Sequence, residues 1–117
     1  MEKPLFCDSI AKRRAVIPAA WFYEWDKAKG KHTFSRKDQG ILFLAGCYKR
    51  YEDGDRFVIL TTDANASMRP VHDRMPLVLE ENEVFDWIFD EKCVTEMLQK
   101  IPCSLQDSMD YGQISLF

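Results

Sequence analysis

The sequence lacks any long hydrophobic run. Its longest apolar stretches are Ala15–Tyr23, which Pro18 interrupts, and Ile41–Tyr48, and both fall far short of the roughly 20 residues that cross a bilayer. The opening Met1-Glu2-Lys3-Pro4 lacks the apolar stretch of a secretory signal peptide. We therefore expect a cytoplasmic protein with no membrane partner.

Metal-ligating residues are also scarce. Cys7, Cys47, Cys93 and Cys103 form no Cys-x-x-Cys pair, and the chain has only 2 histidines. A structural zinc site needs clustered thiolates or imidazoles, so this spacing argues against one. We expect four reduced thiols that mostly pack as small apolar groups, and neither a metal nor an organic cofactor.

Apolar residues and aromatics are sufficient for a globular core. The 117 residues are 46% apolar and include 8 Phe, 4 Tyr and 3 Trp, a composition that predicts one folded domain and excludes disorder. Residues 1–79 are net basic and residues 80–117 net acidic. The basic part could face a phosphate backbone, but a solvated acidic helix face is the more usual explanation of such a split.

The predicted elements run from strands to short helices, which favours an α+β fold with an antiparallel core. We expect helices over 5–11, over 64–68 with Asp63 as cap, and twice after residue 80. Expected strands cover 15–17 and 21–25, bent at Pro18, then 32–37 and 41–51 joined as a hairpin through 38–40, then 56–62 and 71–79. Residues 1–101 would form the domain and 102–117 a C-terminal tail.

Two segments carry residues suited to catalysis. In Trp21–Trp25, a strand would place Glu24 beside Phe22, opposite the face of the other three aromatics. Partial desolvation there would raise the pKa of Glu24 and suit it to proton transfer. The alternative is an aromatic core strand whose glutamate simply points to water.

The second segment is Val71–Pro76. Strand alternation sets His72 and Arg74 side by side, an imidazole next to a guanidinium that could serve acid–base chemistry on a phosphate-bearing substrate. The alternative is a surface strand in which Asp73 and Arg74 pair with neighbours and His72 is incidental. Neither segment is specific by physical chemistry alone.

Taken together and in this order, four motifs resemble the SOS-response-associated peptidase (SRAP) family, whose members are abasic-site processing proteins of the HMCES type. The motifs are the segments 13–19 (RRAVIPA), 22–25 (FYEW), 60–65 (LTTDAN) and 72–76 (HDRMP). The resemblance extends from about Glu2 to Phe89. It implies an α+β fold with a mostly antiparallel, β-barrel-like core, flanking short helices and a groove for single-stranded DNA.

The resemblance also implies a chemistry. The family traps abasic sites through an N-terminal cysteine, whose amine forms an imine with the sugar aldehyde and whose thiol then closes a thiazolidine cross-link. The same cysteine is proposed to serve in autoproteolysis. By this likeness Glu24 and His72 are the catalytic pair, Arg74 holds a phosphate and Thr62 lines the groove.

One departure from the family pattern concerns the nucleophile. Family members begin Met-Cys-Gly-Arg and carry a long N-terminal portion, whereas this chain begins Met1-Glu2-Lys3-Pro4. The amine of Cys7 is locked in a peptide bond and cannot form the imine. We therefore expect an incomplete domain, inactive alone, that is a fragment or pairs with a separate N-terminal half and exposes strand edges.

The final residues suggest a further partner. Gln113, Leu116 and Phe117 resemble the anchors of the bacterial sliding-clamp-binding pentapeptide, although an apolar tail packed on the domain is the simpler reading. Two other classes of function stay open. A non-catalytic module that binds single-stranded DNA or the clamp needs no terminal cysteine, and a cysteine peptidase acting on other proteins would lack the steep salt dependence of phosphate binding.

Overall fold

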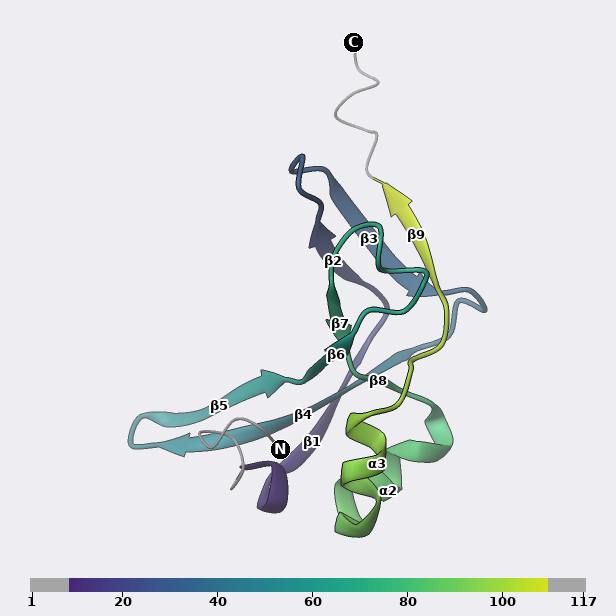
Figure 1. Ribbon diagram of the computed structural model, residues 1–117. Coiled ribbons are helices and arrows are strands. Elements are labelled where there is room, and N and C mark those ends of the chain that lie inside the picture. Colours follow the sequence, from purple (N-terminus) through teal and green to yellow (C-terminus); the bar gives the residue numbers. More distant parts are fainter. Residues whose placement is uncertain (1–8, 110–117) are drawn as a thin grey trace.

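The computed structural model describes residues 9–109, and Figure 1 shows their arrangement. The strands are β1 (Arg14–Ala19), β2 (Phe22–Trp25), β3 (Lys31–Arg36), β4 (Leu42–Tyr51), β5 (Gly54–Ile59), β6 (Thr61–Asp63), β7 (Arg74–Pro76), β8 (Val78–Leu79) and β9 (Leu105–Met109). The helices are α2 (Val84–Phe89) and α3 (Val94–Leu98), each preceded by a 3-10 turn, η1 (Glu81–Glu83) and η2 (Glu91–Cys93). Residues 9–12 form a further helical turn.

These strands form three antiparallel sheets. The first has the order β1-β4-β5 with β8 also paired to β4, the second is β2-β3-β9, and the third is the pair β6-β7. In Figure 1 the β4–β5 hairpin projects to one side, the second sheet rises above it, and α2 and α3 lie below. The predicted α+β class with mostly antiparallel strands is confirmed; within residues 9–109 the sheets do not close into a barrel.

A tryptophan fixes the helices to the first sheet. The Trp87 ring on α2 is fully buried, and its Nε1 donates to the Ala15 carbonyl of β1 at 3.0 Å. Arg14 of β1 donates in turn to the Trp87 carbonyl. Around the ring lie Leu77, Leu79 and other buried apolar residues. An amphipathic α2, as its apolar spacing predicts, therefore covers this sheet.

A second core joins the other two sheets. Phe34 of β3 is fully buried and stacks on Phe22 of β2, with ring centroids 5.4 Å apart. Met68, in the loop between β6 and β7, and Met75 of β7 belong to the same buried cluster. The three-stranded sheet and this loop therefore share one packed interior.

Two expected strand features are wrong. The chain does not bend at Pro18, because β1 continues through it to Ala19; β1 is an edge strand, where a missing N–H is tolerated. Nor do β3 and β4 form a hairpin across residues 38–40. They pair with different neighbours, so this turn passes the chain from one sheet to another.

Residues 64–68 form turns rather than the predicted helix. Asn65, not Asp63, caps them: its side-chain oxygen accepts from the backbone N–H groups of Ser67 at 3.0 Å and Met68 at 3.2 Å. An asparagine side chain that bonds forward in this way competes with helix formation. The turn carries the chain from β6 back to β7.

Strand β9 is also unexpected, since the sequence predicted no regular structure after residue 101. It pairs with β3 along its whole length, from Arg36↔Leu105 to His32↔Met109. Within residues 9–109, no helix is both long and apolar enough to cross a membrane.

Candidate functional site

Two of the four residues predicted to act on DNA line one open groove. Thr62 and Arg74, on the paired strands β6 and β7, border a cavity of about 690 Å³. Its apolar wall includes Leu60 and Leu98, and Lys100 contributes a cation. The groove is therefore lined by residues of β5, β6, β7, α3 and the segment that follows α3.

The guanidinium of Arg74 is held in a fixed orientation. Its Nη1 donates to Asp63 Oδ1 at 2.7 Å, and its Nη2 donates to the Thr61 carbonyl at 2.9 Å. A guanidinium has five N–H donors, so these contacts leave donors for a second acceptor. The exposed arrangement could hold a phosphate, which would have to tolerate the nearby Asp63 carboxylate.

Glu24 lies on β2, where the predicted alternation is confirmed. Trp21, Tyr23 and Trp25 are each about half exposed, at 51%, 50% and 55%, whereas Phe22 and Glu24 point to the other side and are half-buried. One Glu24 oxygen accepts from the backbone N–H of Trp25 at 3.2 Å. The carboxylate therefore lies on the side of the sheet that faces the core, with its other oxygen available.

His72 precedes β7, in the loop that Asn65 shapes. It is exposed, and its Nδ1 accepts from the backbone N–H of Arg74 at 3.2 Å. Because Nδ1 accepts this bond, the neutral imidazole carries its proton on Nε2. The expected strand therefore begins at Arg74 and not at Val71, so His72 and Arg74 do not share a strand face, and they are linked instead by this backbone hydrogen bond.

Glu24 and His72 lie beside the same packed cluster, but their side chains do not hydrogen-bond to each other. Phe22, beside Glu24, packs on the cluster that contains Val71, beside His72. Among residues 9–109 no hydrogen bond joins the two side chains, and neither of them lines the Thr62–Arg74 groove. The structure thus brings Thr62 and Arg74 to one groove, whereas Glu24 and His72 lie outside that groove, each beside a residue of one packed cluster.

A histidine that the sequence did not single out lies directly across from Glu24. His32 of β3 pairs with Glu24 in the strand register, and its ring bridges two carboxylates. Its Nε2 lies 2.8 Å from Asp26 and its Nδ1 2.9 Å from Asp107. The Asp26 contact, helped by Asp107, raises the pKa of His32, and His32 with the Gly30 N–H lowers the pKa of Asp26. Only the position of β9 brings Asp107 here, so the sequence alone gave no signal of it.

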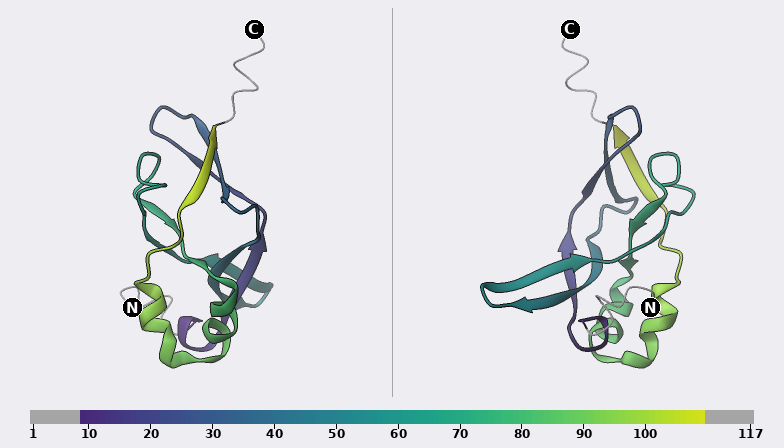
Figure 2. Two further views of the ribbon diagram at one scale, coloured as in Figure 1. Left: turned by 90° about the vertical axis from the view of Figure 1, so that its right-hand side faces the viewer. Right: turned by 60° about the vertical axis from the view of Figure 1, so that its left-hand side comes forward.

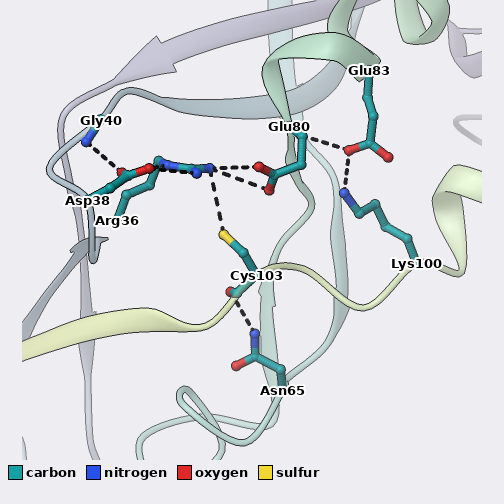
Figure 3. Close-up of polar contacts among 8 residues, drawn as sticks. All are labelled: Arg36, Asp38, Gly40, Asn65, Glu80, Glu83, Lys100 and Cys103. Atoms are coloured by element: carbon teal, nitrogen blue, oxygen red, sulfur yellow. Dashed lines mark hydrogen bonds and ion pairs between the residues drawn. The ribbon is translucent and has the colours of Figure 1, made fainter.

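A polar network ties the segment before β9 to the turn after β3 (Figure 3). Arg36 donates to both oxygens of Asp38, at 2.9 and 3.0 Å, and to Glu80 at 3.2 Å. Arg36 and the Gly40 N–H lower the pKa of Asp38 to about 2. Lys100 pairs with Glu83, which caps the backbone of Glu80. These contacts hold the chain that leads to β9 against the helical region.

The described thiols are poor nucleophiles. Burial raises the pKa of Cys47 and of Cys103, and a hydrogen bond to Asp90 raises that of Cys93. Since the thiolate is the reactive form, none of these three cysteines is activated for attack. Cys47 is buried in one apolar cluster, and Cys93 and Cys103 pack against the clusters, as expected of small apolar groups; Cys7 lies outside the described residues.

A family comparison decides the relationship. The profile described as "SOS response associated peptidase (SRAP)" matches residues 1–115. The chain belongs to the SRAP family. The four motifs that suggested this relationship therefore lie within a family match that covers almost the whole chain.

SRAP relatives of known name are longer than this chain. It is 29% identical to the abasic site processing protein YoaM and 30% identical to the abasic site processing protein YoqW, both of Bacillus subtilis. These alignments cover 97% and 98% of this chain but 55% and 56% of the relatives. The chain thus spans about half the length of these SRAP proteins.

Solved structures that resemble this chain are also longer than it. A crystal structure of a protein from Bacteroides thetaiotaomicron matches with a TM-score of 0.80 and 26% identity, over 92% of this chain and 53% of that protein. One from Bordetella bronchiseptica matches with a TM-score of 0.81 and 25% identity, over 93% and 60%. The SRAP-like arrangement of the sheets is therefore shared.

Proposed function

We propose that this chain is part of an abasic-site processing protein that acts on single-stranded DNA in the response to DNA damage. The observation that carries this proposal is the SRAP match over residues 1–115, together with relatives that are named abasic site processing proteins. The groove at Thr62 and Arg74 supports it, because a positioned guanidinium in an open groove suits a phosphodiester backbone.

Glu24 and His72 are proposed to move protons during cross-linking. An N-terminal cysteine amine attacks the aldehyde of the ring-opened sugar, and loss of water gives an imine. The thiol then adds to the imine carbon, and its proton passes to the nitrogen to complete the thiazolidine. An acid is needed to expel water and a base to accept the amine proton, roles that a half-buried carboxylate and an exposed imidazole can share.

The cysteine itself is proposed to come from a complementing N-terminal half. Cys47, Cys93 and Cys103 have internal amines and raised thiol pKa values, so they cannot form the ring. Autoproteolysis, which gives the family its peptidase name, would need the same terminal residue. We therefore propose that this chain alone forms no covalent link and acts with a cysteine-initiated segment in cis or in trans.

The test uses a single-stranded oligonucleotide with one abasic site. The chain is incubated with it, with and without a separately made cysteine-initiated N-terminal half, and a denaturing gel reports covalent product. We expect a shifted band only when both halves are present. Glu24→Gln should slow its formation at least tenfold, as for loss of a general acid or base, while affinity for the intact strand is retained.

The controls separate binding from chemistry. Arg74→Gln should weaken binding of an undamaged strand and reduce its salt dependence by about 0.7 in the log–log slope, the value for one phosphate contact. A band with this chain alone would indicate a lysine imine and would overturn the assignment of the nucleophile. No band from either the mixed halves or a fused chain would overturn the proposed function.

The sliding-clamp contact stays a separate proposal. Gln113, Leu116 and Phe117 lie outside the described residues, so only binding can test it. A peptide of residues 108–117 should bind a purified bacterial clamp, and the same peptide with alanine in place of Leu116 and Phe117 should not. Equal binding by both peptides would contradict the assignment of these anchors.

A further inference from the structure

The tip of the β4–β5 hairpin extends beyond the rest of its sheet. Strand β1 pairs with β4 only as far as Cys47, whereas β4 and β5 pair on to Tyr51↔Gly54. Residues 48–57 therefore form a two-stranded ribbon that is joined to the body at Tyr48, whose N–H donates to the Arg13 carbonyl at 3.0 Å, and that projects beyond it, as Figure 1 and Figure 2 show. A ribbon of two strands buries little apolar surface, so its side chains are not dictated by a core.

This ribbon places like charges opposite each other. Lys49 of β4 pairs directly with Arg56 of β5, an arrangement that destabilises a sheet. Both cations lie over the ring of Tyr51, with Arg56 Cζ 4.8 Å and Lys49 Nζ 5.7 Å from its centroid. The Tyr51 side chain is 48% exposed. One face of the ribbon thus presents an aromatic ring between two cations.

The opposite face repeats the pattern. Tyr48 pairs with Phe57 across the strands, and Arg50 Cζ lies 5.7 Å from the Tyr48 ring. Acidic residues accompany the arginines: Asp53 pairs with Arg56 at 2.8 Å, Asp55 lies opposite Arg50, and Glu52 occupies the turn. Lys49 has no ion pair with a carboxylate within the described part of the chain. Aromatic rings interleaved with cations are the surface that binds single-stranded nucleic acid, by stacking bases and attracting phosphates.

The ribbon is continuous with the groove. Strand β5 leads from Arg56 to Val58 and Ile59, which line the same cavity as Thr62 and Arg74. Thr62 follows Arg56 by 6 positions, which corresponds to about 20 Å along a strand. A stacked DNA strand covers this distance in about six nucleotides, at 3.4 Å each.

We propose that the ribbon of residues 48–57 is a second contact surface for single-stranded DNA, which continues the path of a strand bound at Thr62 and Arg74. This inference rests on the proposed function, because it assumes that the groove binds DNA. The proposal predicts that the contacts depend on the length of the DNA strand. Short strands occupy only the groove, and longer strands also reach Lys49, Tyr51 and Arg56.

The experiment measures binding of oligothymidylates of about 6 and about 15 nucleotides by fluorescence anisotropy. Lys49→Glu should weaken binding of the longer strand about tenfold and lower its salt slope by about 0.7, while the shorter strand changes less than about twofold. The matched control is Lys37→Glu, the same charge change in the turn between β3 and β4, on the far side of the molecule from the ribbon (Figure 1). It should leave both strands within about twofold.

Folding cannot account for such a loss. Lys49→Glu places opposite charges across from Arg56, so its unfolding midpoint should not fall. Tyr51→Ala is a second test variant. It should weaken binding of the longer strand about tenfold and leave the salt slope unchanged, as expected for loss of stacking.

The remaining outcomes overturn the inference in distinguishable ways. If Lys49→Glu and Lys37→Glu reduce the affinity for the longer strand equally, or if neither reduces it, the ribbon is not a DNA contact. The groove would remain a DNA site in both cases. Binding of neither strand by the folded wild-type protein would overturn the groove, and with it the DNA part of the proposed function.

Discussion

The first and second sheets are stabilised by different kinds of contact. In the sheet β1-β4-β5, apolar burial dominates, with Trp87, Leu77 and Cys47 fully enclosed. In the sheet β2-β3-β9, one face is an exposed aromatic surface, and β9 is fixed by charged groups, His32 with Asp107 and the Arg36 network before it. The first sheet is therefore held mainly by apolar burial, whereas the second combines a buried core that includes Phe34 and Leu105 with contacts between ionisable groups.

This difference has a consequence for function. The β2-β3-β9 sheet carries Glu24, and its polar attachments leave that carboxylate near groups that change charge with pH. The first sheet keeps such groups away from its interior and instead supplies a rigid base for the groove. Predictions that separate the two kinds of contact test this comparison directly.

The largest effect is expected in the first sheet. Trp87→Ala removes a fully buried ring and the hydrogen bond from its Nε1 to Ala15, so the free energy of unfolding should fall by about 3–5 kcal/mol. Urea denaturation followed by far-UV circular dichroism measures it. Phe85→Ala, an exposed aromatic on the same helix, is the matched control and should cost less than about 1 kcal/mol. Similar losses in both variants would contradict a core centred on Trp87.

A smaller effect is expected from the polar network. Arg36→Gln leaves Asp38 and Glu80 without their guanidinium, and partial solvent screening limits the loss of unfolding free energy to about 1–2 kcal/mol. The control is Arg56→Gln, which breaks an exposed pair with Asp53 and should change it by less than about 0.5 kcal/mol. If the two variants behave alike, the Arg36 network contributes no more than a surface ion pair.

The smallest effect is a dependence on pH. The folded pKa of His32 lies above its ordinary value of 6.5, so the stability that His32 contributes is fully present below that value and is lost as pH rises through the folded pKa. The folded pKa of Asp26 lies below 3.8, so its contribution is present above that value and is lost as pH falls through the folded pKa.

These signs define the measurement. The wild-type protein should exceed His32→Asn in unfolding free energy at about pH 5.5, and the difference should shrink at about pH 9. A His32 proton resonance that titrates below its ordinary value in NMR would contradict the assignment. A constant difference between the two proteins at all pH values would show that His32 acts through packing alone.

The sequence predicted the first region better than the second, for a physical reason. One of the two helices expected after residue 80 is α2, and the expected strands 41–51 and 56–62 correspond to β4 and to β5 with β6, with Gly54 at a positive φ in the turn between β4 and β5. Strand β9 reads Leu-Gln-Asp-Ser-Met and shows no apolar alternation, because Leu105 is its one buried side chain and the rest of the strand is held by backbone pairing and by the contact of Asp107 with His32. Long-range polar contacts leave no local pattern in a sequence.

The same limit applies to the candidate site. The sequence placed Thr62 and Arg74 on two expected strands, whose pairing the structure adds, and strand alternation predicted the side on which Glu24 lies. The pairing of His32 with Asp107, and the separation of Glu24 from the groove, depend on how sheets pack and could not be read from spacing. The functional roles of these four residues rest on the family likeness and stay predictions.

The loop that carries His72 is anchored at its base to the C-terminal part of the chain. The Asn65 amide donates to the carbonyls of Pro102 and Cys103 at 2.9 Å each, and Ser67 Oγ accepts from the Leu105 N–H at 3.0 Å. Cutting the chain after residue 101 would strip these partners from the loop as well as removing β9. For anyone engineering a shorter version, the segment before β9 therefore belongs to the scaffold of the His72 loop, and affinity tags are better placed beyond it.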